Sequence, residues 1–220
     1  MLKRIFKILV LILIISFFAS CTVVRHDEKG KKSQGDVTFY FESKDFDAAS
    51  YVKENWDSQI IPEIRDNAVQ LEDLIDLLGS DQEEAEKKYG IRKEDTSPYA
   101  YIVKGEYAVK ELNRDSAVGY LYIDQSDLSD GLCAIQVGPV FKLSAVRDAL
   151  SFINFGDFSN QIEFANISRE INFYVRDNVT AGLGDTVPEN SRVSFYGVFL
   201  MDKEGKVIIT PVILDLSTGE

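Results

Sequence analysis

The chain has 220 residues, 45% hydrophobic and 27% charged, which suits one ordinary domain or two small ones and excludes a disordered polymer. Three of its 24 basic residues lie in the first seven positions, so 21 bases face 36 acids in the remainder, a net charge of −15. That charge disfavours nucleic acid as a partner and electrostatic docking onto anionic lipid, so only a lipid or a hydrophobic anchor would hold the body at a membrane.

The first 21 residues have the layout of an exported leader. Residues 1–7 are basic, residues 8–18 are apolar apart from Ser16, and two small residues precede Cys21. The apolar run is shorter than the ~20 residues of a spanning helix, as in secretory signals. A cysteine after small residues resembles a lipobox, in which the thiol receives a diacylglyceryl group, although Phe18 stands where the box usually has Leu. The alternative is an ordinary secretory signal with a chance cysteine.

We therefore predict a signal peptide over residues 1–20 and a polar, lipidated tether over residues 21–46. Acyl chains on Cys21 would anchor the protein to a membrane of the cell envelope, facing the periplasm or the exterior. The sole histidine, His26, lies in the tether, and no Cys/His metal spacing, P-loop or dinucleotide fingerprint occurs, so we expect no metal and no cofactor. Cys133 lies in an apolar run and is expected to be a small buried residue.

A helical subdomain is predicted over residues 47–97. Asp47 is a plausible N-cap, Trp56 is the centre of an apolar face, and Pro62 is expected to break or kink the helix. A second stripe over residues 71–78 is followed by Gly79. Asp81 and Glu84 indicate a capping box for a third helix.

Residues 98–220 change to strand periodicity. Strands are expected over residues 99–109, 117–124, 132–141, 193–201 and 207–216, with Pro211 marking an edge or a bulge. Between the third and fourth strands, a short helix capped by Ser144 and a longer one from Asn166 are expected. The fold class is therefore α+β, with an N-terminal helical subdomain packed on a small OB-like antiparallel β-barrel that carries an inserted helix.

Six blocks with consistent order and spacing resemble one family. They are residues 88–92 (KYGIR), 97–99 (SPY), 103–106 (VKGE), 136–140 (QVGPV), 147–153 (RDALSFI) and 157–165 (DFSNQIEFA). The chain resembles domain of unknown function 2291, predicted periplasmic lipoproteins, with Tyr99 where the family often has Trp and Tyr107 where it often has Gly. The resemblance implies a helical subdomain on an OB-like barrel and frequent gene neighbourhood with ribose-type sugar ABC transporters. It brings no established activity and no catalytic residues.

The densest polar cluster lies around residues 155–164, where carboxylates and amides alternate with aromatic rings, the chemistry of sugar recognition. The alternative, favoured about two to one, is that the polar residues cap turns while the rings fill the core. Arg147 and Asp148 form either a buried or a solvent-facing pair. The candidate ligand or interaction surface comprises Asp157, Phe158, Asn160, Gln161, Glu163 and Arg147.

Three functions remain open, and the first is preferred. It is a non-catalytic accessory or binding module that works beside a sugar ABC transport system and contacts its components or a sugar. The second is an envelope glycosidase or related hydrolase that uses carboxylates such as Asp157 and Glu163. The third is an oligonucleotide-binding barrel, which the net charge disfavours.

Overall fold

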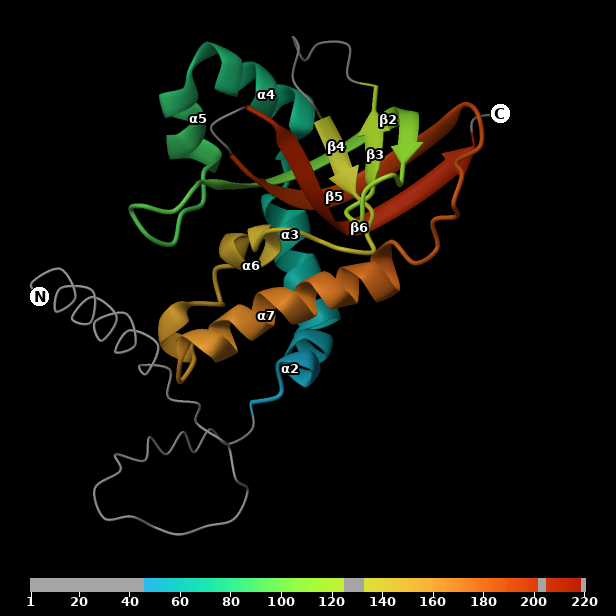
Figure 1. Ribbon diagram of the computed structural model, residues 1–220. Helices are drawn as coiled ribbons and strands as arrows, with labels where there is room; N and C mark the ends of the chain where they lie inside the picture. Colours follow the sequence, from blue (N-terminus) through green and yellow to red (C-terminus); the bar gives the residue numbers. More distant parts are fainter. Residues whose placement is uncertain (1–45, 125–132, 202–204, 219–220) are drawn as a thin grey trace, which may run out of the picture. The chain divides into compact units, whose positions relative to one another are not determined.

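The computed structural model describes residues 46–124, 133–201 and 205–218. These residues belong to one compact unit, Ser43–Glu220, in which helices pack on a β-barrel (Figure 1). Cys21, the predicted signal peptide and all of the tether except Phe46 lie outside the described residues.

The first helical run is longer than the sequence indicates. It comprises α2 (Ala48–Asn55), a π-helical turn (η1, Trp56–Ile60) and α3 (Ile61–Asn67). Asp47 caps it as predicted, since its Oδ1 accepts the N–H groups of Ala49 and Ser50 at 3.1 Å each. The run does not break at Pro62, which is the second residue of α3 and so lies in the first turn of a helix, where a missing N–H group is tolerated.

Two further helices follow, α4 (Leu71–Ser80) and α5 (Gln82–Tyr89). Gly79 lies inside α4 rather than after it. Asp81 caps α5 as predicted, with its Oδ1 3.0 Å from the Glu84 nitrogen, and Gly90 follows the last residue of α5.

The barrel has five strands, as predicted: β2 (Ala100–Asn113), β3 (Tyr120–Ile123), β4 (Cys133–Gln136), β5 (Ser191–Leu200) and β6 (Val207–Thr218). They pair in the order β2-β3-β4-β6-β5, and β5 pairs back onto β2 to close the ring. All ring pairs are antiparallel except β4–β6, which is parallel. A two-residue strand, β1 (Val69–Gln70), adds to β2 outside the ring.

Pro211 lies at a bulge, as its position predicts. The β5–β6 register shifts between Tyr196, which pairs with Ile213, and Gly197, which pairs with Pro211. A Cβ atom at Gly197 would lie 2.6 Å from Ile209 Cγ2 and 2.7 Å from the Thr210 carbonyl oxygen, so the two strands approach too closely there for any side chain.

The segment between β4 and β5, which we call the insert (residues 137–190), contains α6 (Ala145–Ala149), a 3₁₀ turn (η2, Phe155–Asp157), α7 (Gln161–Tyr174) and a π-helical turn (η3, Val175–Val179). The predicted start of the longer helix at Asn166 is wrong. Asn160 is the N-cap instead, because its Oδ1 accepts the N–H groups of Ile162 at 2.9 Å and Glu163 at 3.0 Å. Ser144 is the N-cap residue of α6, as predicted, but its hydroxyl donates to Asp148 Oδ2 instead of accepting a backbone N–H group.

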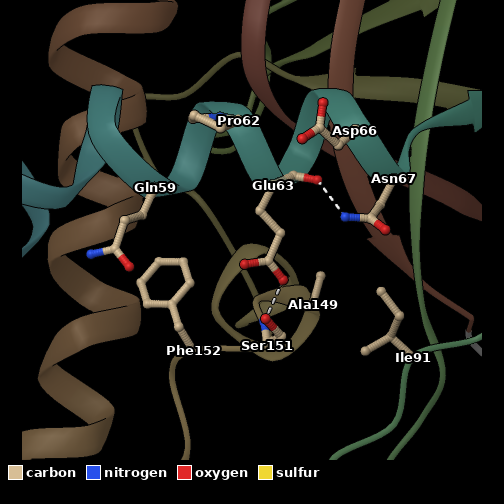
Figure 2. A pocket seen from close by; sticks show the side chains of 9 residues that line it. All are labelled: Gln59, Pro62, Glu63, Asp66, Asn67, Ile91, Ala149, Ser151 and Phe152. Carbon is tan, nitrogen blue, oxygen red and sulfur yellow. Dashed lines mark hydrogen bonds between the residues drawn. The ribbon is translucent and has the colours of Figure 1, made fainter.

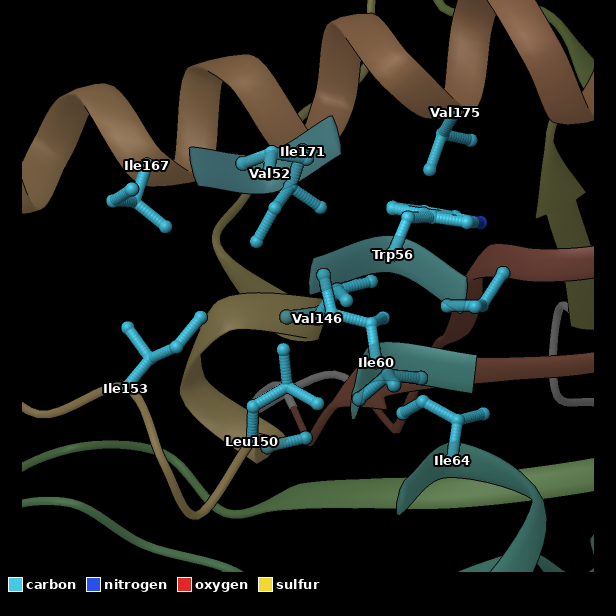
Figure 3. Packing of buried hydrophobic residues seen from close by; sticks show 14 of the residues in the cluster. Val52, Trp56, Ile60, Ile64, Val146, Leu150, Ile153, Ile167, Ile171 and Val175 are labelled. Carbon is cyan, nitrogen blue, oxygen red and sulfur yellow. The ribbon is translucent and has the colours of Figure 1, made fainter. Parts of the chain in front are cut away.

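The helices and the insert share one apolar core (Figure 3). Trp56 is 3% exposed and stacks on Tyr174 with 4.2 Å between ring centroids, which confirms its predicted core position. A second core fills the barrel and reaches α4 and α5. It includes Cys133, whose burial raises the pKa of the thiol to about 12.

Candidate functional site

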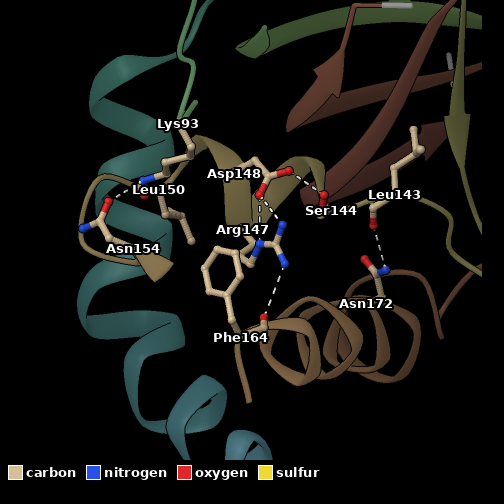
Figure 4. Close-up of polar contacts among 9 residues, drawn as sticks. All are labelled: Lys93, Leu143, Ser144, Arg147, Asp148, Leu150, Asn154, Phe164 and Asn172. Atoms are coloured by element: carbon tan, nitrogen blue, oxygen red, sulfur yellow. Dashed lines mark hydrogen bonds and ion pairs between the residues drawn. The ribbon is translucent and has the colours of Figure 1, made fainter. Parts of the chain in front are cut away.

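Arg147 and Asp148 fix α6 against α7 (Figure 4). Arg147 donates from Nε (2.8 Å) and Nη2 (2.6 Å) to Asp148 Oδ1, and from Nη1 (3.3 Å) to the carbonyl oxygen of Phe164. Its guanidinium carbon lies 3.9 Å from the centre of the Phe164 ring. The side chains of the pair are 14% and 22% exposed, so the pair is largely buried at the junction of two insert helices.

Lys93 reaches the insert from the loop that precedes the barrel. Its Nζ donates to the Leu150 carbonyl oxygen at 2.5 Å and to Asn154 Oδ1 at 3.2 Å (Figure 4). Desolvation by burial is the main cause that lowers the pKa of Lys93, and the nearby carboxylates of Glu63 and Asp148 counteract it in part. Lys93 therefore ties the helical part to the loop between α6 and η2.

A pocket of about 390 Å³ lies between these two cations, and we call it the Arg147 pocket. Phe155 stands on its wall, 52% exposed, and meets the Phe164 ring edge-on at 5.6 Å. The volume is within the range of small-molecule sites. Its lining residues are Ile91, Lys93, Glu94, Ser97, Pro98, Arg147, Asp148, Asn154, Phe155, Gly156 and Phe164.

A second, shallower hollow of about 600 Å³, the α3 groove, runs beside α3 (Figure 2). Gln59, Glu63 and Asn67 line it at helical spacing, and Phe152 faces them from the insert. Glu63 Oε1 accepts the Ser151 N–H at 2.5 Å, which holds α3 to the loop after α6. Ile91 borders both hollows.

The predicted polar cluster around residues 157–163 is used mainly for helix caps. Asp157 Oδ2 accepts the Asn154 N–H at 2.9 Å in a capping box. Glu163, 8% exposed, accepts the Ser159 N–H at 3.0 Å and the Asn160 amide at 3.3 Å. These bonds satisfy the turn at the start of α7.

The remaining predicted site residues have different positions and roles in the structure. Phe158 packs in an aromatic group with Phe46 at 5.3 Å and Phe164 at 5.6 Å, and Gln161 is exposed at the first position of α7. Arg147 is the one predicted site residue that lines a described pocket. Sequence reasoning missed Lys93, whose role depends on contacts nearly sixty positions away, and the α3 groove, which the spacing of Gln59, Glu63 and Asn67 could have indicated.

Among residues 46–124, 133–201 and 205–218, no group of three or more His, Cys, Asp or Glu side chains is placed to hold a metal ion. In the same described ranges, no helix is both long and apolar enough to cross a bilayer.

The comparisons with known proteins agree with this fold. Residues 11–215 match the family described as predicted periplasmic lipoprotein, DUF2291. The chain belongs to this family. It is thus a membrane-anchored lipoprotein of the cell envelope, and the family description brings no molecular activity.

Among solved structures, the chain is similar to an OB-fold protein from Thermotoga maritima at 18% identity and a TM-score of 0.63, covering 79% of this chain and 100% of that one. This likeness supports the OB-like fold alone. A search of curated proteins finds no match.

Proposed function

We propose that this lipoprotein, acylated on Cys21, is a non-catalytic binding module that takes a small polyhydroxylated ligand, such as a sugar, in the Arg147 pocket and works beside a sugar ABC transport system. The observation that carries the proposal is the meeting of cationic donors and an exposed aromatic ring in one pocket of about 390 Å³. The other residues of the candidate surface would then hold the pocket in place and would not touch the ligand. These residues are Asp157, Phe158, Asn160, Gln161 and Glu163.

The donors around the pocket are not all used within the protein. The Lys93 ammonium has three N–H groups and two acceptors, Leu150 and Asn154. The Arg147 guanidinium has five N–H groups, of which three are in hydrogen bonds. Free donors next to the Asp148 and Glu94 carboxylates suit a ligand whose hydroxyl groups both accept and donate.

Phe155 supplies the apolar part of the site. A phenylalanine that is 52% exposed keeps apolar surface in water unless something covers it. Its ring stands at 90° to Phe164, so its faces are not stacked on that neighbour. A sugar can place its C–H face there while its hydroxyl groups reach Lys93 and Arg147.

The alternative of a carboxylate-dependent hydrolase has less support. Asp157 and Glu163, its proposed pair, both accept backbone N–H groups at helix starts, and neither lines one of the described pockets. A glycosidase needs two carboxyl groups that face the same bond across a substrate-sized gap.

Calorimetric titration with pentoses and hexoses tests the proposal. We expect saturable binding of at least one sugar, with Phe155→Ala weakening it about three- to ten-fold, as the loss of one ring contact implies. Leu216→Ala, on the barrel, is the control and should bind as wild type does. Flat titrations with every sugar, together with no transporter subunit cross-linked in cells, would remove the proposal.

A further inference from the structure

One face of α7 carries apolar side chains in solvent. Ile162 is 72% exposed and Phe173 is 41% exposed, and 11 positions separate them. At 3.6 residues per turn they point within about 20° of each other, and Arg169 lies about 20° to the other side of Ile162. The Arg176 guanidinium lies 4.6 Å from the Phe173 ring centre, which confirms that the two side chains share this face.

A second apolar edge runs beside the helix. Val140 is 47% exposed and Leu143 is 55% exposed, and Pro139, Val140 and Phe141 form a groove of about 380 Å³ with the Arg169–Arg176 face. Together we call Val140, Leu143, Ile162, Arg169, Phe173 and Arg176 the α7 strip.

The protein holds this edge in place firmly. Leu143 has φ +75°, a backbone conformation that costs energy for a residue with a side chain. Asn172 on α7 donates to its carbonyl oxygen at 3.1 Å (Figure 4). The buried Gln136 accepts from the backbone nitrogen of Lys142 at 2.9 Å and donates to its carbonyl oxygen at 3.3 Å. A strained backbone is thus maintained by three bonds while the Leu143 side chain stays in water.

The exposure is concentrated rather than scattered. Six large hydrophobic side chains are exposed in the described part of the chain, and four of them are in the α7 strip. The other two are Phe155 in the Arg147 pocket and Leu216 on the barrel. Apolar surface gathered in this way marks a contact with a partner or a membrane.

The charges around the strip differ from those of the whole molecule. Arg169 lies 3.2 Å from Glu170 and Arg176 lies 2.6 Å from Asp177, and the exposed Lys142 directly precedes Leu143 in the chain. Three cations against two anions make this surface slightly positive, whereas the body carries −15. This surface therefore does not repel anionic lipid headgroups, although the molecule as a whole is strongly negative.

The chain enters the described domain next to the start of α7. The described domain begins at Phe46, whose ring lies 5.3 Å from Phe158, just before the start of α7. Phe46 follows Cys21 by 25 positions, a distance of at most ~90 Å even when fully extended. A protein tethered there meets the membrane continually, whereas a soluble partner has to diffuse to it.

We propose that the α7 strip is a membrane-contacting surface, which lies on the headgroup region of the bilayer that holds the lipid anchor. Phe173, Ile162, Leu143 and Val140 enter the interface, and Arg169, Arg176 and Lys142 meet lipid phosphates. The acidic remainder then points away from the lipid. The inference rests on the proposed acylation of Cys21 and not on the proposed sugar site.

The test uses the full lipidated chain, its acylation verified by intact mass, in vesicles of phosphatidylethanolamine and phosphatidylglycerol. A nitroxide is attached to Phe173→Cys or Ile162→Cys, with Leu216→Cys as the control on the barrel. The buried thiol of Cys133, with a pKa of about 12, does not compete for the label. We expect labels on the strip to collide several-fold more with oxygen, relative to a water-soluble nickel chelate, than the control label does.

Equal collision ratios at the strip and at Leu216 on acylated protein would overturn the membrane contact alone. Protection of the strip labels that disappears as protein is diluted at constant lipid would also overturn it, and would indicate a second copy as the occupant. An intact mass showing unmodified Cys21 would contradict the anchor and the membrane contact together, while sugar titration would still report on the Arg147 pocket.

Discussion

The barrel and the insert differ in where they leave their apolar side chains. Of the six exposed large hydrophobic residues in the described ranges, five lie in the insert and one, Leu216, lies on the barrel. Inside the barrel, Tyr101, Phe195 and Phe199 are at most 1% exposed. This difference underlies both proposals, in which the barrel is the scaffold and the insert, with Lys93 reaching it from the preceding loop, carries the binding surfaces.

The largest expected effect is on stability, from a barrel residue. Phe199 is fully buried and stacks on Tyr101 with 5.3 Å between ring centroids. Phe199→Ala should lower the free energy of unfolding by about 3–5 kcal/mol, because it removes apolar contacts and leaves a cavity. Phe155→Ala in the insert should change it by less than about 0.5 kcal/mol. Urea unfolding measures both, and equal losses would contradict the division into scaffold and binding surface.

A smaller effect is expected from the junction of α6 and α7. Asp148→Asn removes the charge that receives two Arg147 bonds, and should cost about 1.5–3 kcal/mol of unfolding free energy. Asp177→Asn breaks an exposed pair of similar geometry and should have a much weaker effect, since solvent screens it. Urea unfolding of the two variants shows whether the stability of the protein depends on the buried Arg147–Asp148 pair. Similar losses of unfolding free energy in both variants would mean that it does not.

The smallest expected effect of a substitution is an increase in stability. The buried Tyr101 hydroxyl has no hydrogen-bond partner among the described residues, so Tyr101→Phe should raise the free energy of unfolding by about 1 kcal/mol. Thermal unfolding at neutral pH measures the gain. A loss of stability would show that the hydroxyl has a partner.

At alkaline pH, Tyr101 and Lys93 should change the free energy of unfolding in opposite directions. Burial raises the pKa of Tyr101 and of Tyr107 to about 12, so the unfolded chain releases these protons first and stability falls as pH rises from about 10 to 12. Lys93, whose pKa is lowered, contributes in the opposite direction below pH 10.5. Tyr101→Phe should flatten the decline in unfolding free energy above pH 10, and an unchanged slope would contradict the assignment.

Local signals in the sequence predicted much of this fold. Asp47 and Asp81 as caps, Pro211 at a bulge, and five strands with a helical insert between the third and fourth all follow from nearest neighbours and periodicity. The start of α7 was missed because Asn160 was assigned to the candidate polar surface, whereas its side chain caps the helix. The subdomain boundaries and the acylation of Cys21 stay predictions.

The candidate site was less predictable, because it depends on contacts between distant segments. Arg147 was found through its charge next to Asp148, but the pocket also needs Lys93, which lies far back in the chain and bonds to a backbone carbonyl oxygen that no sequence pattern marks. Polar residues at 157–163 resembled a binding cluster because helix caps use the same side chains as sugar sites.

Chemical-shift mapping by NMR, with the sugar that binds most tightly in calorimetry, tests most directly whether the insert is the binding element. We expect shifts in amide resonances around Lys93, Arg147, Asn154 and Phe155, with the strands of the barrel unaffected. Shifts confined to the outer wall of the barrel, or to Gln59 and Asp66 in the α3 groove, would contradict it.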